Sequence, residues 1–80
     1  MMTDADECFS RAEIGRRIKV MMTHRNMTFS EIARVAGTDP NKSRLWATGE
    51  SSPSVLSLFR LCRALNCSAD YILGLREEKP

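Results

Sequence analysis

The sequence contains few of the residues on which metal centres, disulfide frameworks and membrane spans depend. Its one histidine, His24, has no cysteine or histidine at a ligand spacing. There are three cysteines, an odd number that does not suit a disulfide framework. Cys62 and Cys67 form a C-x4-C pair without the second pair of ligands that a zinc site needs, and we expect them to be buried thiols. No apolar run approaches the roughly 20 residues of a membrane span. We therefore expect no metal and no membrane association.

Sequence signals of catalysis are also missing. The four glycines do not form a phosphate-binding loop, and no nucleophile stands at a recognisable spacing from a base. We therefore expect no enzymatic activity, no cofactor and no small-molecule substrate. The first residues, MMTDADEC, are acidic and polar, unlike a signal peptide. Together with the free thiols, they favour a reducing cytoplasm.

The charge is unevenly distributed along the chain, although the net charge is only +2. Residues 11–45 contain eight Lys or Arg and three acids, a net of +5, whereas residues 1–10 carry −3. A basic middle section favours a polyanion as partner. A solvated helix surface would give the same pattern, so charge alone does not decide.

Capping residues and apolar periodicity predict five short helices. Each predicted start offers a side chain that can accept from free backbone N–H groups, and the starts are Ser10, Thr28, Asp39, Ser52 and Ser68. Left-handed end residues are predicted at Asn26, Gly37, Gly49 and Gly74. Pro40 and Pro53 suit the first helical position. Apolar residues at helical spacing include Ile14, Ile18 and Met21 near the N-terminus, and Val55, Leu58, Leu61, Cys62 and Leu65 later.

No strand pattern is found, and eighty residues make one domain. We therefore predict a compact all-α domain over residues 10–75, with an acidic N-terminal tail at 1–9 and a C-terminal tail at 76–80. Residues 36–39 alone separate the second and third predicted helices, with a glycine in the turn. This is the spacing of a helix-turn-helix, whose second helix enters the DNA major groove. The second of these helices runs from about Pro40 to Thr48.

Several motifs in this array are typical of one family: RIK around Arg17, MTFSEIARVAG at 27–37, Trp46, Gly49, Pro53 and LFRLCRALNCSADYILG at 58–74. From about Ile14 to Gly74 the chain resembles the lambda-repressor-like, Cro/C1-type helix-turn-helix family. The resemblance implies a five-helix fold and sequence-specific binding of double-stranded DNA in transcriptional regulation. It also implies a homodimer on a palindromic operator. We expect the dimer contact near Leu65, Tyr71 and Leu75, although Leu65 and Tyr71 could equally be core.

The candidate DNA-binding residues are Asn41, Lys42, Arg44, Leu45, Thr48, Arg34, Arg16 and Arg17. An amide at Asn41 suits adenine, and Arg44 suits guanine or a phosphate. Lys42 suits a phosphate, which contributes affinity without sequence information. Leu45 could touch a thymine methyl, pack at the helix edge or bind a protein. For Thr48 and the three other arginines, a phosphate contact and a solvated surface both remain open.

Two departures from the family pattern bear on function. Phe29 stands where the family commonly has Gln, which bonds a phosphate and a recognition-helix side chain, so we expect looser specificity here. Met22 and Ala47 together replace a semi-buried Arg–Glu pair, a double change that leaves no charge stranded. Phe29 and Leu45 keep a second function open: a helix-turn-helix-derived protein-interaction module, antitoxin-like or a regulatory partner, with weakened DNA binding. Asn41, Lys42 and Arg44 favour DNA.

Overall fold

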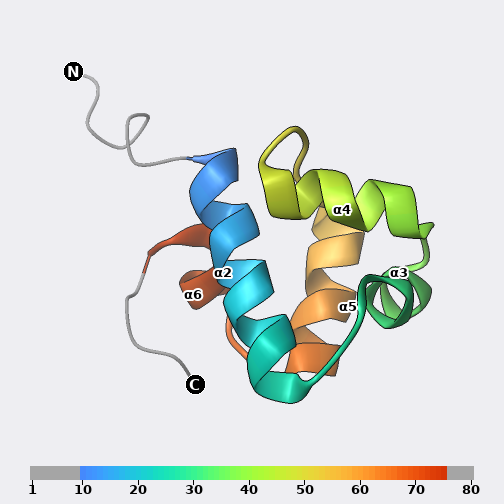
Figure 1. Ribbon diagram of the computed structural model, residues 1–80. Coiled ribbons are helices and arrows are strands. Elements are labelled where there is room, and N and C mark those ends of the chain that lie inside the picture. The colour runs from blue at the N-terminus through green and yellow to red at the C-terminus, as the bar shows by residue number, and fades with distance from the viewer. Residues whose placement is uncertain (1–9, 76–80) are drawn as a thin grey trace.

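The computed structural model describes residues 10–75, which contain five helices and no strand (Figure 1). The predicted tails at 1–9 and 76–80 lie outside the described residues. The helices are α2 (Arg11–Arg25), α3 (Phe29–Ala36), α4 (Pro40–Thr48), α5 (Val55–Leu65) and α6 (Ala69–Leu73). The all-α prediction is confirmed.

Each of the five helices begins at a capping side chain and ends at a residue in the left-handed conformation. Ser, Thr or Asp side chains accept from the backbone N–H three residues ahead at every start, and a left-handed Gly or Asn ends every helix. Thr28 and Glu31 form a reciprocal capping box, in which the Thr28 N–H donates to the Glu31 carboxylate over 2.8 Å. Local sequence therefore determines the helix boundaries.

The predicted start of the fourth helix is wrong. Ser54, not Ser52, is the cap of α5, and its Oγ accepts from the backbone N–H of Ser57 over 3.1 Å. Pro53 consequently precedes the cap instead of occupying the first turn. Both serines offer the same hydroxyl on either side of one proline, so the local chemistry does not distinguish them.

The core is formed by one face of each helix around α2. Its most deeply buried large side chains are Ile18, Met21, Ile32, Leu61, Leu65 and Ile72. Met22 and Trp46 belong to the same buried cluster. Met22 is therefore buried, as expected for an apolar residue at a position where the family often has a semi-buried charge. Val55 does not belong to it: 86% of Val55 is exposed, because α5 begins there and only its later turns lie on the core.

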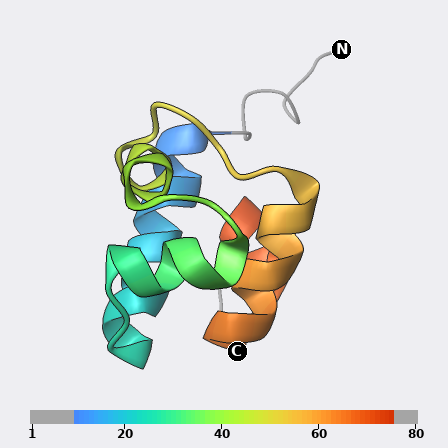
Figure 2. The same ribbon diagram turned by 90° about the vertical axis from the view of Figure 1, so that its right-hand side faces the viewer.

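Helices α3 and α4 are arranged so that α4 lies across the molecule with one side uncovered (Figures 1 and 2). Three residues join α3 to α4, and α3 packs on both α4 and α5. The inner side of α4 packs on the first half of α2. Helix α4 is therefore held in place by α2 and α3, with α5 behind α3, and its outer side faces solvent.

The crossing of α2 and α4 is close enough to require glycine. A Cβ on Gly15 would overlap with the carbonyl oxygen of Trp46 and lie 2.6 Å from that of Ala47. At the end of α4, a Cβ on Gly49 would lie 2.8 Å from Cα of Ala12. Backbone atoms cannot swing aside as a side-chain tip can, so any larger residue at position 15 must push α4 away from α2.

We expect Gly15→Ala to destabilise the fold although alanine is the better helix former. Overpacking a tight contact costs about 1–3 kcal/mol, and the gain in helix propensity returns at most about 1 kcal/mol. A net loss of roughly 1–2 kcal/mol is expected in a urea unfolding titration. The control is Thr23→Ala, which raises helix propensity at an exposed position of the same helix. A Gly15→Ala chain at least as stable as the wild type would contradict the close crossing.

Candidate nucleic-acid interface

The outer face of α4 is polar and carries two cations. Asn41, Lys42 and Arg44 are exposed, whereas Ser43, Trp46 and Ala47 on the same helix are buried. The helical period of 3.6 residues produces this division. Asp39 is committed to capping, since its Oδ1 accepts from the Lys42 backbone N–H over 2.8 Å. The exposed face therefore offers an amide, an ammonium and a guanidinium within one turn.

Ser43 fixes α4 to the start of α3. Its Oγ lies 2.9 Å from the carbonyl oxygen of Pro40 and 3.2 Å from that of Phe29. The side chain is fully buried, so this polar contact has no competition from water. The position of α4 relative to the first residue of α3 is consequently well defined.

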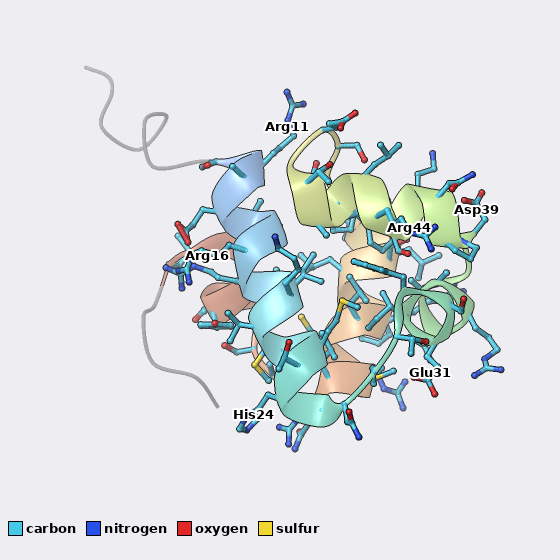
Figure 3. The ribbon with its side chains drawn as sticks, in the orientation of Figure 1. Arg11, Arg16, His24, Glu31, Asp39 and Arg44 are labelled. Carbon is cyan, nitrogen blue, oxygen red and sulfur yellow. The ribbon has the colours of Figure 1, made fainter. Side chains whose placement is uncertain are left out.

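The side chain of Phe29 lies beneath the guanidinium of Arg44. The Arg44 Cζ atom is 5.6 Å from the ring centroid, within the range of a cation–π contact, and Figure 3 shows Arg44 between α4 and α3. Phe29 is half-buried and packs against the core cluster. Looser specificity was expected because Phe29 lacks the hydrogen bonds of the usual Gln, but the aromatic face of Phe29 contacts an arginine of α4 without any hydrogen bond.

Leu45 and Thr48 occupy the end of the same helix. Leu45 is 38% exposed, the most accessible apolar side chain of α4. The Thr48 hydroxyl donates to the Leu45 carbonyl over 3.1 Å and lies 3.4 Å from the Glu50 carboxylate. Its proton is thus engaged within its own turn, and a negative charge stands beside it. Both features disfavour an anion at this position.

A hollow beside Phe29 adds two exposed residues that are not among the sequence-predicted candidates, Lys19 and Thr23. The volume of the hollow is about 380 Å³, and its lining residues from the second half of α2 to the start of α3 are Lys19, Met22, Thr23, Asn26, Met27 and Phe29. Lys19 and Thr23 stand four residues apart on α2, and therefore on one face. That spacing is the signal that the sequence contains for them.

Arg17 was expected to be a candidate DNA-binding residue, but it is buried and cannot reach a partner. It is 4% exposed, and its Nη1 donates to the Tyr71 carbonyl over 3.1 Å. Its Cζ lies 5.1 Å from the Tyr71 ring centroid, and its Nε lies 3.6 Å from the Glu13 carboxylate. The helical period explains the error, since position 17 shares the inner face of α2 with positions 14, 18 and 21. Arg17 joins α2 to α6.

The two other candidate arginines outside α4, Arg16 and Arg34, are exposed. Arg16 pairs with Glu13 and projects from the flank of α2 that faces away from α4 (Figure 3). Arg34 is exposed on α3. The structure therefore brings Asn41, Lys42 and Arg44 together, adds Lys19 nearby, and leaves Arg16 apart from them.

Burial of Cys62 and Cys67 disfavours the thiolate form of both side chains. Burial raises the pKa of Cys62, and burial together with the neighbouring Cys62 raises the pKa of Cys67 to about 12. Both side chains are half-buried. Within residues 10–75, no three His, Cys, Asp or Glu side chains are grouped so as to hold a metal ion. No helix in that part of the chain has the length and apolar character needed to cross a membrane.

Comparisons with known proteins agree with this geometry. The family model of the Cro/C1-type helix-turn-helix DNA-binding domain matches residues 17–78. No curated protein sequence shows significant similarity to the chain. The P22 c2 repressor, solved in complex with a synthetic operator, is similar at 27% identity and a TM-score of 0.71. That similarity covers 75% of this chain and 91% of the repressor.

Two further structures share the fold. The restriction-modification controller protein C.AhdI from Aeromonas hydrophila has 18% identity and a TM-score of 0.71, over 78% of this chain and 94% of that one. The clp gene regulator ClgR from C. glutamicum has 22% identity and the same TM-score, over 80% of this chain and 83% of that one.

Proposed function

We propose that this chain, which belongs to the Cro/C1-type helix-turn-helix DNA-binding domain family, reads the DNA major groove with the outer face of α4. The family makes it a DNA-binding transcriptional regulator. The observation that carries the proposal is the exposed Asn41, Lys42 and Arg44 on a helix whose opposite face is buried. The operator complex of the P22 c2 repressor supports it by similarity.

The residues of α4 divide into base-reading and phosphate-binding roles. Asn41 stands at the second position of the helix, nearest the groove floor, and its amide matches N6 and N7 of adenine. Arg44 follows three residues later on the same face and matches O6 and N7 of guanine. Lys42 neutralises a phosphate. Leu45 is placed to meet a thymine methyl at the edge of this face.

Phosphate contacts beside α4 come from α2 and α3. Lys19 and Thr23 take the place of Arg17 in the proposed interface, because they are exposed at the hollow beside Phe29. Arg34 contributes from the surface of α3. Arg16 and Thr48 contribute least, since Arg16 faces away from α4 and Thr48 is engaged within its own turn.

A protein-binding role for this surface is the weaker candidate. Such a role needs an apolar recognition face, but Phe29 is half-buried and covered by Arg44, which leaves Leu45 alone. The proposed activity is binding without catalysis, cofactor or small-molecule substrate. We place it in the cytoplasm, where DNA is accessible and Cys62 and Cys67 stay reduced.

We further propose that two copies bind a palindromic operator. One domain offers one recognition helix, and two half-sites a helical turn apart need a two-fold pair. Leu65 and Tyr71 are buried in the core, which is the alternative that the sequence left open for them, so neither is available for the contact. Exposed apolar side chains instead gather at the start of α5, where Val55, Leu56 and Phe59 are exposed beside a groove of about 540 Å³. Leu75 is exposed too.

Base reading by Asn41 is tested by titrating the full chain against its operator and a scrambled duplex at one salt concentration. Asn41→Ala is expected to weaken operator binding by about 1–3 kcal/mol, the worth of a good bidentate base contact. Binding to the scrambled duplex should change little, since it depends on phosphates. Equal losses on both duplexes would make Asn41 a positioning residue.

Phosphate binding by Lys42 is tested through the salt dependence of affinity. Lys42→Ala should weaken binding to all sequences alike and make the log–log slope shallower by about 0.9, the value for one lost phosphate contact. The matched control is Arg17→Lys, which disturbs a buried contact to the Tyr71 carbonyl. That variant should lower stability and leave the slope unchanged. An unaltered slope in Lys42→Ala would remove Lys42 from the interface.

The two-fold arrangement is tested by native mass spectrometry of the chain on operator duplexes. Two chains per full operator and one per half-site are expected at saturation. Phe59→Ser should abolish cooperative binding of the second copy to the full operator, because Phe59 belongs to the proposed contact between the two copies. Phe59 is exposed, so the substitution leaves the core intact. The half-site duplex is its control and should bind the variant normally. One chain bound to a saturated full operator would exclude the dimer.

A further inference from the structure

We infer that Phe29 determines which base this regulator prefers, by holding Arg44 in position to read guanine. The inference rests on the proposed function, since it concerns a residue of the same surface. Its observation is separate: the guanidinium of Arg44 lies over the Phe29 ring, 5.6 Å from Cζ to centroid. Phe29 is a positioning residue that acts through Arg44.

The ring is held firmly enough to position another side chain. Phe29 is the first residue of α3, directly after the Thr28 cap, and its side chain packs against the core cluster. The buried Ser43 hydroxyl shares its one proton between the Phe29 carbonyl oxygen, at 3.2 Å, and the Pro40 carbonyl oxygen, at 2.9 Å. Because Ser43 immediately precedes Arg44, the same contact fixes the backbone from which Arg44 projects. Ring and arginine are therefore tied to one frame.

The contact with the ring favours base reading over a phosphate contact. An exposed arginine normally loses considerable side-chain freedom when it binds, and a ring beneath its guanidinium, 5.6 Å from Cζ, removes part of that freedom beforehand. An aromatic face is not a conventional hydrogen-bond acceptor, so the N–H donors of the guanidinium stay available to a base. Those N–H groups match the two acceptors of guanine in a bidentate contact. A phosphate can be gripped from many directions and gains less from a guanidinium that is held beforehand.

Within residues 10–75, no ion pair holds Arg44 away from the ring. Glu13 on α2 pairs with Arg16 and Arg17, not with Arg44. The cap residue Asp39, on the same helix, is engaged with the Lys42 backbone. Among the described contacts of Arg44, the ring is thus the one that orients its charge. A leucine at position 29 would fill similar space and lack the aromatic face.

The experiment measures affinities of the full chain for its operator and for every single-base-pair substitution of one half-site. Arg44→Ala first identifies the base pair read by Arg44, as the one whose substitution no longer matters. Phe29→Leu is then expected to reduce the preference at that base pair by about two- to fivefold, the size of an exposed cation–π contact. Preferences at other base pairs should remain. Phe29→Tyr keeps an aromatic face and should behave as the wild type.

Combining the variants separates positioning from simple structural damage. In the Arg44→Ala background, Phe29→Leu should have no further effect on base preference. A thermal melt of each variant confirms that it is folded. Unchanged preference at the Arg44 base pair in Phe29→Leu would overturn the inference, and so would an equal loss at every position. If the wild-type chain did not distinguish operator from scrambled DNA, the proposed function itself would fail, which is a different result.

Discussion

The close crossing of α2 over α4 at Gly15 determines how α4 sits on the domain. The two backbones meet at the carbonyl oxygens of Trp46 and Ala47, where no Cβ fits. Trp46, on the inner side of α4, is buried in the shared core. These contacts fix how far α4 stands from the domain and which way it faces. The helical period turns Asn41, Lys42 and Arg44 away from the core, so these polar side chains face solvent.

The junction of α3 and α4 adds precision to this frame. Ser43 ties α4 to the carbonyl of Phe29, and the Phe29 ring supports Arg44. A position where the family commonly carries Gln has thus kept a bracing role through a different interaction. An amide would use a hydrogen bond for this purpose, whereas an aromatic face attracts the guanidinium charge without one. The N–H donors of Arg44 therefore stay available to a base.

Much of the fold could be predicted from the sequence because helix ends are local. The capping box at Thr28 and Glu31 and the glycines at 37 and 49 mark boundaries through their own chemistry. What the sequence could not supply depends on neighbours distant along the chain. Arg17 looks like a surface cation until Tyr71 is packed beside it, and Gly15 looks incidental until α4 crosses it. Within the candidate site, helical periodicity is enough to predict that Asn41, Lys42 and Arg44 are exposed on one face. The position of Phe29 beneath Arg44 depends on how α3 packs on α4, and only the structure shows it.

Reading of a specific DNA sequence by α4 can be measured by selecting bound duplexes from a random pool with the purified full chain. We expect enrichment of two inverted copies of one half-site, centred about 10–10.5 base pairs apart. We also expect adenine and guanine at fixed positions in each half-site, for Asn41 and Arg44. A pool that stays random after repeated selection would contradict sequence-specific reading by α4.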